Sequence, residues 1–208
     1  MRGISIDNGP VEQTAALGNE KKKNKLRFLV PLAMILTVAA IACSGSSGST
    51  SILGDETPSS VDLTPDFSIN MFQGQNVVGG QDVSLHSLLG EKPMVLNFWA
   101  GLCPPCEAEL TDLQEFNDEY HDQVLLVGVD LGQFFGLGNQ QDAKNLLARK
   151  EITYPAGFTA DPDVIRDYKV LGMPTTIFID REGQIFNKWT GALNSSILEE
   201  KTLEMLAQ

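Results

Sequence analysis

Two cysteines with two residues between them stand at the end of an apolar run. Cys103 and Cys106 follow the run from Val95 to Ala100. This spacing allows the two sulfur atoms to close a small disulfide ring. Such a pair can change between the dithiol and the disulfide, so its position between an apolar strand and a helix predicts thiol redox chemistry.

Two other roles for the Cys103–Cys106 pair are weaker. A structural disulfide between them would close a very short loop and would therefore remove little chain entropy. A zinc site would need four ligands, and no second pair of Cys or His residues accompanies these two in the sequence. We therefore expect no metal, and no cofactor other than the redox-active disulfide itself.

Hydrophobic periodicity predicts the elements that position the pair. Residues 94–99 form a nearly continuous apolar run, which is typical of a strand buried on both faces. After the pair, apolar side chains recur every three or four positions and predict a helix with one face toward the core. Pro105 fits the first turn of that helix, where a missing N–H costs nothing.

The remaining elements place the pair in an α/β fold. Around the strand and helix already described, the pattern predicts a strand at 65–71, a turn at 73–76, a return strand from 77, a strand at 124–129, a glycine-punctuated loop at 130–139, a helix around 143–147, a short helix after 162, a strand at 175–179, its hairpin partner at 184–190 and a final helix at 194–207. We therefore expect a central mixed β-sheet flanked by helices, with an N-terminal β-hairpin extension.

The charge of the 208 residues is unevenly distributed. The net charge at pH 7 is −12, yet the chain before Cys43 holds six Lys and Arg against three Asp and Glu. The chain after Cys43 holds nine basic and 24 acidic residues, a net charge of −15. Such an acidic body lacks the clustered positive charge that phosphate contacts need, which argues against nucleic acid as a partner.

The first 43 residues carry a pattern for export. Basic residues at 21–27 precede an uncharged, apolar run at 28–42, which is shorter than a comfortable bilayer span. The run ends at Cys43 and resembles a bacterial lipoprotein signal, in which this cysteine is lipidated, although Ala40 stands where Leu is usual. The alternative is an uncleaved anchor helix. Both predict a body at the cell membrane on its extracytoplasmic face, because the basic flank stays inside.

A Ser- and Gly-rich segment joins this signal to the body. Residues 44–63 predict a flexible tether with a mean end-to-end reach of about 25 Å. The chain therefore divides into a signal or anchor at 1–43, a tether at 44–63 and a catalytic domain at 64–208. With Cys43 lipidated, Cys103 and Cys106 are the only thiols of the body.

Motifs in the body resemble the thioredoxin superfamily, and within it the membrane-tethered thiol-disulfide oxidoreductases of the TlpA/ResA/DsbE group. The motifs are Asn97-Phe98-Trp99-Ala100 before Cys103-Pro104-Pro105-Cys106, then Glu109 and Leu113, the stretch from Tyr168 to Thr176, and the turn from Ile179 to Gly183. The resemblance covers the chain from about Pro65 to its end and implies a thioredoxin fold.

The resemblance also implies a role for each residue of the site. Cys103 would be the exposed nucleophile and Cys106 the buried resolving thiol, with Pro174 as a cis-proline that faces the disulfide. Asn97 takes the place of the buried Asp of ordinary thioredoxins and has no carboxylate, which leaves Glu109 or water as the candidate proton relay. The substrate-facing residues would be Trp99, Leu102, Pro104, Pro105, Met173 and Pro174.

The neighbours of Cys103 predict the direction of electron flow. Pro104 and Pro105 supply no N–H to a thiolate, and Glu107, where Arg or Lys is frequent, adds negative charge. Weak thiolate stabilisation makes the dithiol a better electron donor, so we predict a reductase. Leu102 replaces a frequent Trp and alters the substrate-facing surface. The resemblance implies a membrane electron donor of the CcdA/DsbD type and disulfide-bonded protein substrates such as apocytochrome c.

Two interpretations stay open for the loop at 132–139. Its residues Phe134, Phe135 and Leu137 either tuck under the loop as a small satellite core or form an apolar contact for the substrate or the electron donor. Replacing the two phenylalanines separates these interpretations, because only the first expects a general loss of stability.

Three other functional classes compete with the oxidoreductase. A peroxiredoxin-like thiol peroxidase would have Thr where Ala100 stands. A copper-carrying assembly factor of related fold would have a wider cysteine spacing and a partnering His. A non-enzymatic membrane-tethered binding module would not need the intact pair.

Overall fold

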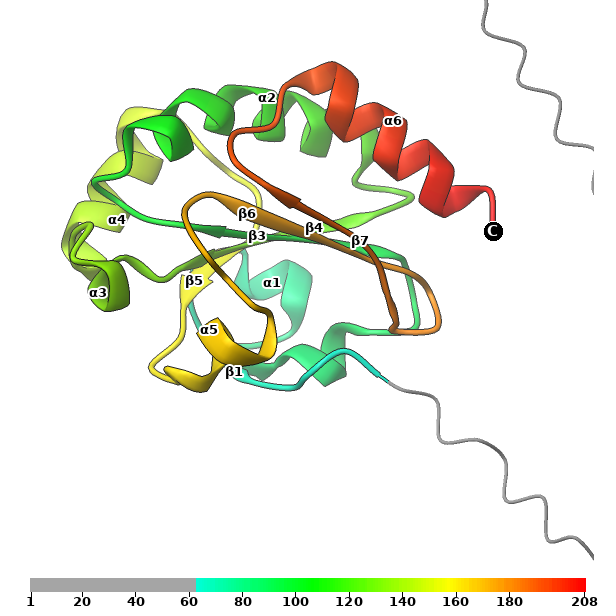
Figure 1. The fold of residues 1–208 in the computed structure, drawn as a ribbon, viewed down its shortest axis with the longest axis horizontal. Coiled ribbons are helices and arrows are strands. Elements are labelled where there is room, and N and C mark those ends of the chain that lie inside the picture. The colour runs from blue at the N-terminus through cyan, green and yellow to red at the C-terminus, as the bar shows by residue number, and fades with distance from the viewer. Residues whose placement is uncertain (1–62) are drawn as a thin grey trace, which may run out of the picture. The chain divides into compact units, whose positions relative to one another are not determined.

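A seven-stranded mixed sheet forms the middle layer of residues 63–208, which the computed structural model describes (Figure 1). The strand order is β2-β1-β5-β4-β3-β6-β7. Strands β3, β4 and β5 run parallel to one another, whereas β6 and β7 on one side and β1 and β2 on the other pair antiparallel with their neighbours. The predicted central mixed sheet is therefore confirmed.

The elements follow the predicted order with a few additions. They are β1 (Ser68–Gln73), α1 (Gln75–Val78), β2 (Asp82–Ser84), the 3-10 helix η1 (Leu85–Leu88), β3 (Met94–Trp99), α2 (Pro104–Tyr120), β4 (Leu125–Asp130), α3 (Gly132–Phe135), α4 (Gln140–Arg149), β5 (Ala156–Phe158), α5 (Asp163–Asp167), β6 (Thr175–Ile179), β7 (Ile185–Thr190) and α6 (Ser195–Leu206).

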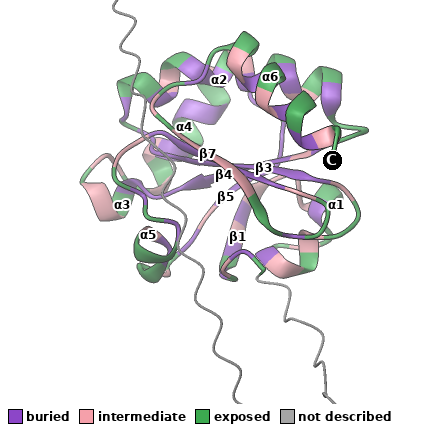
Figure 2. Ribbon diagram, turned by 45° about the vertical axis from the view of Figure 1, so that its right-hand side comes forward, coloured by how far each residue is buried: buried purple, intermediate pink, exposed green. Residues whose placement is uncertain are grey.

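Helices cover both faces of the sheet (Figure 1). On one face, α2, α4 and α6 share an apolar cluster with sheet residues such as Val95 and Phe178. On the other face, α1, α5 and η1 pack around a second cluster that includes Leu96 and Ile177. β3 lies between the two clusters and is buried along its whole length (Figure 2). This burial on both faces explains why residues 94–99 are almost continuously apolar.

The register of the central strands brings three chain segments to one edge of the sheet. β3 runs parallel to β4 with Trp99 opposite Asp130, and antiparallel to β6 with Phe98 opposite Thr175. The chain that leaves β3 toward Cys103 therefore starts beside Asp130 at the end of β4 and beside Pro174 at the start of β6.

The N-terminal hairpin extension is present, but its return strand lies later than predicted. Val77 and Val78 belong to the helical turn α1 and not to a strand, and the return strand is β2. Gly74 and Gly79 flank this turn with φ values of 81° and 83°, a conformation that glycine adopts without strain. Two apolar residues in a row cannot distinguish a helical turn from a strand start, so the pattern was misleading here.

Two short elements were missed. β5 has three residues and contains a glycine, so it shows no alternation, and α3 is a single turn inside the predicted loop. The predicted segments 1–43 and 44–63, with Cys43, lie outside the described residues except for Leu63. Within residues 63–208, no helix combines the length and the apolar character that a membrane crossing requires.

Candidate active site

The two cysteines sit at the junction of β3 and α2 and are joined by a disulfide bond. Cys103 is the N-cap of α2, and its Sγ accepts a hydrogen bond from the backbone N–H of Cys106 at 3.3 Å. Pro104 and Pro105 occupy the first two positions of the helix and have no N–H to offer. The sulfur of Cys103 therefore receives less donation from the helix start than it would from two ordinary residues.

Both sulfur-bearing residues are buried in the disulfide form. Cys103 is 3% exposed and Cys106 is fully buried, so the expectation of an exposed Cys103 is wrong for this state. The physical reason is packing, because both residues belong to the apolar cluster between α2 and the sheet, against which Met173 also packs. Leu102 stands directly before Cys103 and is 59% exposed, so an apolar side chain lies at the surface next to the buried disulfide.

The residues predicted to face the substrate divide into two groups. Leu102, Pro104 and Pro105 are exposed beside the disulfide, and Met173 is half-buried. Trp99 is fully buried with its indole against Gly128 of β4, so its predicted contact with substrate is wrong. The indole fits there because Gly128 has no side chain, and a Cβ atom on Gly128 would lie 3.0 Å from Trp99 Nε1.

Pro174 is buried where the chain enters β6, and the Met173–Pro174 peptide bond is cis. Because Thr175 pairs with Phe98, this bond lies at the same edge of the sheet as the start of the cysteine segment. Three residues before Pro174, Leu171 is 87% exposed. A half-buried Met173 and an exposed Leu171 therefore come directly before β6, at the edge of the sheet where the cysteine segment starts.

Glu109, three residues after Cys106 on α2, is a buried carboxyl group. It is 1% exposed, and its two oxygens accept hydrogen bonds from Asn97 Nδ2 and from the backbone N–H of Leu193, both at 2.9 Å. Asn97 Nδ2 also donates to Thr176 Oγ1 at 3.0 Å. Burial raises the pKa of Glu109 to about 7, although both hydrogen bonds favour the charged form. This group can therefore bind or release a proton near neutral pH.

Glu107 does not increase the negative charge at the site in the way the sequence suggests. Its carboxylate oxygens lie 3.3 Å from Arg149 Nη2 and 3.4 Å from Lys150 Nζ, both at the C-terminal end of α4. These two cations compensate its charge. The expectation that Glu107 opposes a thiolate at Cys103 is therefore wrong, and the reason is a long-range contact that the local sequence does not reveal.

The loop at 132–139 packs against the body on both sides of the sheet. Phe134 and Phe135 are half-buried against the cluster that contains α5, and Leu137 packs against the cluster that contains the disulfide. The carbonyl oxygen of Leu137 accepts a hydrogen bond from the backbone N–H of Leu102 at 2.9 Å. This packing favours the satellite-core interpretation for the two phenylalanines, while the main chain of Leu137 touches the cysteine segment directly.

Asp130 is a candidate residue that sequence analysis missed. It is 2% exposed at the end of β4, opposite Trp99, and burial raises the pKa of its carboxyl group to about 6. A carboxylate that ends a buried strand directly before a glycine-rich loop was the available signal. Its burial depends on packing by α3 and α4, which local periodicity does not show.

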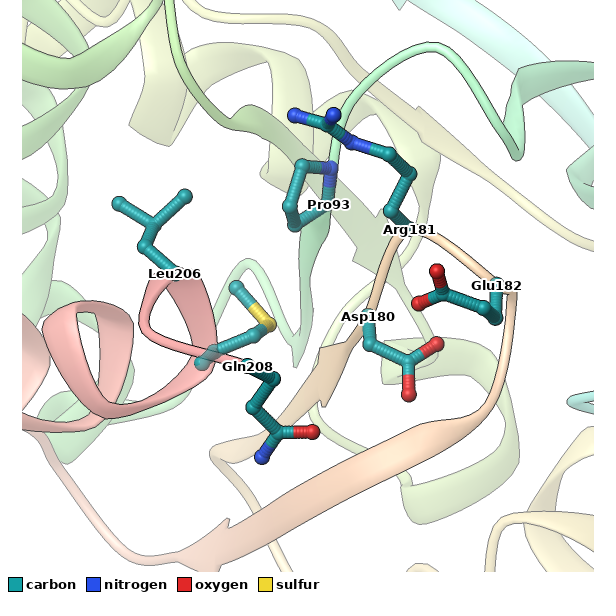
Figure 3. Close-up of a pocket in the computed structure, with 7 residues that line it drawn as sticks. Pro93, Asp180, Arg181, Glu182, Leu206 and Gln208 are labelled. Atoms are coloured by element: carbon teal, nitrogen blue, oxygen red, sulfur yellow. The ribbon is translucent and has the colours of Figure 1, made fainter.

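A separate cavity of about 170 Å³ lies at the opposite end of β3 and β6 from the disulfide. Figure 3 shows it between Pro93, the turn at Asp180 and Glu182, and the C-terminal residues Leu206 and Gln208. Asp180 uses its carboxylate within the turn, where it accepts from the backbone N–H of Gln184 at 2.8 Å. This cavity is therefore no part of the cysteine site. Within residues 63–208, no cluster of three or more His, Cys, Asp or Glu residues could hold a metal ion.

Comparison with known proteins agrees with this geometry. Residues 62–188 match the sequence profile of the AhpC/TSA family. The thiol-disulfide oxidoreductase ResA of Oceanobacillus iheyensis is 30% identical over 191 residues, 91% of this chain and 93% of that protein. The crystal structure of StoA from Bacillus subtilis matches with a TM-score of 0.55 and 26% identity over 67% of this chain and 98% of that one. The crystal structure of a protein from Chlorobium tepidum assigned as the thiol:disulfide interchange protein DsbE matches with a TM-score of 0.58 and 27% identity. The match covers 70% of this chain and 96% of that one.

Proposed function

The chain belongs to the AhpC/TSA family and is a thioredoxin-like thiol-disulfide oxidoreductase of the ResA, StoA and DsbE type, and from this premise we propose that it reduces protein disulfides outside the cytoplasm. The observation that carries the proposal is the Cys103–Cys106 disulfide at the start of α2, with the buried carboxyl of Glu109 three positions after Cys106 on the same helix. In this proposal Cys103 is the attacking thiolate and Cys106 the resolving thiol.

The reaction consists of two thiol-disulfide exchanges. The Cys103 thiolate attacks one sulfur of a substrate disulfide, which forms a mixed disulfide and releases the other substrate sulfur as a thiolate. The Cys106 thiolate then attacks Cys103 Sγ, which closes the Cys103–Cys106 disulfide and releases the second substrate thiolate. The substrate gains two electrons and the enzyme dithiol loses two.

Glu109 is suited to take the proton that Cys106 must lose before the second exchange. The two residues lie three positions apart on α2 and therefore face the same side of the helix. Because burial raises the pKa of Glu109 to about 7, both of its protonation states are populated near neutral pH. Asn97 and the Leu193 N–H hold the carboxyl in place through both of its oxygens.

The prolines after Cys103 favour the direction of reduction. Because Pro104 and Pro105 offer no N–H, the Cys106 N–H is the donor to Cys103 Sγ among the described residues. A thiolate with little stabilisation makes the dithiol less stable relative to the disulfide, and such a dithiol is a stronger reductant. The compensated charge of Glu107 adds nothing to this argument, which therefore rests on the prolines.

Location and partners follow from the resemblance and the first 63 residues. The basic cluster at 21–27, the apolar run at 28–42 and Cys43 support attachment to the outer face of the cell membrane through a lipid or an anchor helix. A reductase in an oxidising compartment needs an electron supply, so we include a membrane thiol transporter of the CcdA/DsbD type as donor. The substrate class is disulfide-bonded protein, with apocytochrome c as the candidate that the resemblance implies.

A trapping experiment tests the proposal. Cys106→Ala removes the resolving thiol, so a reduced variant mixed with a disulfide-bonded protein should accumulate a mixed disulfide on Cys103 that intact-mass spectrometry detects. Cys103→Ala is the matched control and should trap no substrate. The assigned roles would be contradicted if both variants trapped the substrate equally, or if only Cys103→Ala trapped it, through Cys106.

A further inference from the structure

The chain that leads from β3 to Cys103 is held by the segment of residues 131–143, here called the α3–α4 segment. Leu131 and Leu137 of this segment make main-chain hydrogen bonds across the junction. The N–H of Leu131 donates to the carbonyl of Trp99, and the N–H of Leu102 donates to the carbonyl of Leu137, both at 2.9 Å. Residues 100–102 are thus fixed at both sides by an element outside the cysteine helix.

Two glycines show how closely the two backbones approach. A Cβ atom on Gly101 would lie 2.4 Å from the backbone N of Ala143, a distance that real Cβ atoms do not reach. A Cβ atom on Gly132 would lie 3.3 Å from Ala100 Cβ, across the contact, and 3.0 Å from Asp130 Oδ1. Residues 100–102 therefore pack main chain against main chain on the α3–α4 segment, with little room for movement.

The carboxyl group of Asp130 lies inside this contact. Its Oδ1 accepts a hydrogen bond from the N–H of Gly132 at 3.0 Å, and the N–H of Gly101 faces the same carboxyl. Gly132 belongs to the α3–α4 segment, whereas Gly101 stands two residues before Cys103. One buried carboxyl therefore accepts a hydrogen bond from the α3–α4 segment and lies near enough to the N–H of Gly101 for that group to lower its pKa.

We propose that Asp130 is a positioning residue for disulfide exchange, because its carboxylate ties residues 100–102 to the α3–α4 segment and so fixes Cys103 and Leu102 for attack on a protein disulfide. The consequence for catalysis rests on the proposed function, whereas the tie itself does not. Misplacing a reacting group by about 1 Å can cost on the order of 10²-fold in rate. Greater mobility of residues 100–102 is therefore expected to slow the attack of Cys103 on a substrate disulfide, although both cysteines are unchanged.

The tie depends on the charge of the carboxyl group. An ionised carboxylate accepts two N–H groups, whereas a protonated one carries an O–H that needs an acceptor of its own. The groups that act on Asp130 are the N–H groups of Gly101 and Gly132, which lower its pKa, and the carboxylate of Asp142 in α4, which together with burial raises it to about 6. The tie should therefore weaken as the pH falls through about 6.

Two substitutions test the proposal in the full chain. Asp130→Ala removes the acceptor and should lower the rate of protein-disulfide reduction at pH 7 about tenfold, with increased amide hydrogen exchange at Gly101 and Leu102 and unchanged exchange at Leu198 in α6. Asp130→Asn keeps one amide oxygen as acceptor. Its rate should stay within about threefold of wild type and should lose the inflection near pH 6.

Each outcome decides the proposal. Unchanged rate and exchange in Asp130→Ala, or an equal rise in exchange at Leu198, would overturn it, because the second result describes general destabilisation. If Asp130→Ala does not fold, an inflection near pH 6 that persists in Asp130→Asn would overturn it. If the wild-type protein reduces no protein disulfide, the proposed function fails, and the exchange at Gly101 and Leu102 still decides whether Asp130 holds this segment.

Discussion

Two buried carboxyl groups belong to elements that adjoin the cysteine segment, α2 and β4, and they accept hydrogen bonds from different groups. Glu109 lies in α2 and accepts from a side chain and from the distant backbone of Leu193. Asp130 lies at the end of β4 and faces the backbone of its own loop and of Gly101. Burial raises both pKa values, to about 7 and about 6. Burial is therefore the main reason that both pKa values lie near neutral pH. The hydrogen-bond partners of each carboxyl group determine which part of the site its protonation affects.

The comparison assigns the two groups to different parts of the reaction. Glu109 shares a helix face with Cys106, so a proton on its carboxyl can be exchanged with the thiol that must ionise. Asp130 holds main-chain groups before Cys103, so its proton changes the position of the nucleophile. The first role affects the chemical step at every substrate, and the second affects the alignment of the attacking residue.

The largest effect is expected from Glu109→Gln. This change removes the proposed proton acceptor on the helix face of Cys106 and should slow the resolution step about 10²- to 10³-fold, in the range of general acid–base catalysis. The rate above pH 7 should also lose its dependence on a group with a pKa of about 7. Stopped-flow measurement of mixed-disulfide resolution checks both effects. Glu107→Gln is the matched control two residues away, and an equal loss in that variant would refute the assignment.

Glu109 and Asp130 should each change the free energy of unfolding over a different range of pH. Each has a higher pKa in the folded chain than its usual value, 4.5 for Glu109 and 3.8 for Asp130, so the folded state holds the proton more tightly. Each carboxyl therefore contributes its full stability at pH values below its usual pKa. This contribution is lost as the pH rises through about 7 for Glu109 and through about 6 for Asp130. The loss amounts to roughly 3 kcal/mol for each group.

Urea unfolding between pH 4 and pH 8 measures this dependence. Asp130→Asn should flatten the fall in unfolding free energy between about pH 4 and 6, and Glu109→Gln should flatten the fall between about pH 4.5 and 7. An unchanged slope in either variant would show that the corresponding carboxyl is not responsible. A slope of opposite sign in the wild type would contradict the raised pKa values.

A smaller effect is expected at Leu102, on the side of the segment that Asp130 holds. Leu102→Ser removes an apolar side chain that is 59% exposed beside the disulfide, so the KM for a protein substrate should rise about three- to tenfold. The rate with a small disulfide such as oxidised glutathione should stay the same. Leu203→Ser, which changes a 49% exposed leucine on α6, is the control. An equal KM change in both variants would remove Leu102 from the substrate surface.

The smallest effect is expected for the exposed carboxylate Glu107. Its ion pairs with Arg149 and Lys150 lie at the surface, where such pairs contribute at most about 1 kcal/mol. Arg149→Gln should therefore change the unfolding free energy by less than that amount and the rate by less than about threefold, at low and at high salt. A loss comparable with that of Glu109→Gln would mean that charge at the helix start, and not the buried carboxyl, controls the thiols.

The parts of the site that the sequence could predict are those set by local pattern. The cysteine spacing, the strand before it and the helix after it are encoded within about 25 residues, and each was found where predicted. The central mixed sheet followed from the order of these patterns. Glu109 was identified through its position after Cys106, although its burial and its contact with Leu193 needed the folded chain.

The parts that could not be predicted depend on contacts between distant segments. Asp130 becomes important because α4 packs against Gly101, and Glu107 loses its expected influence because α4 ends beside it. Trp99 points into the core because β4 has a glycine opposite Asn97, which leaves room for the indole. The direction of these side chains and the compensation of their charges thus depend on packing between distant elements. The hydrophobic periodicity of the sequence carries no information about that packing.

The reduction potential of the Cys103–Cys106 pair tests the central claim most directly. The full chain would be equilibrated with defined ratios of reduced and oxidised dithiothreitol at pH 7, and the dithiol fraction would be read by alkylation and mass spectrometry. With two prolines after Cys103 and little stabilisation of its thiolate, we predict a potential close to that of thioredoxin, about −270 mV. A potential near −120 mV, at the strongly oxidising end of the range for such proteins, would contradict a role as a reductase.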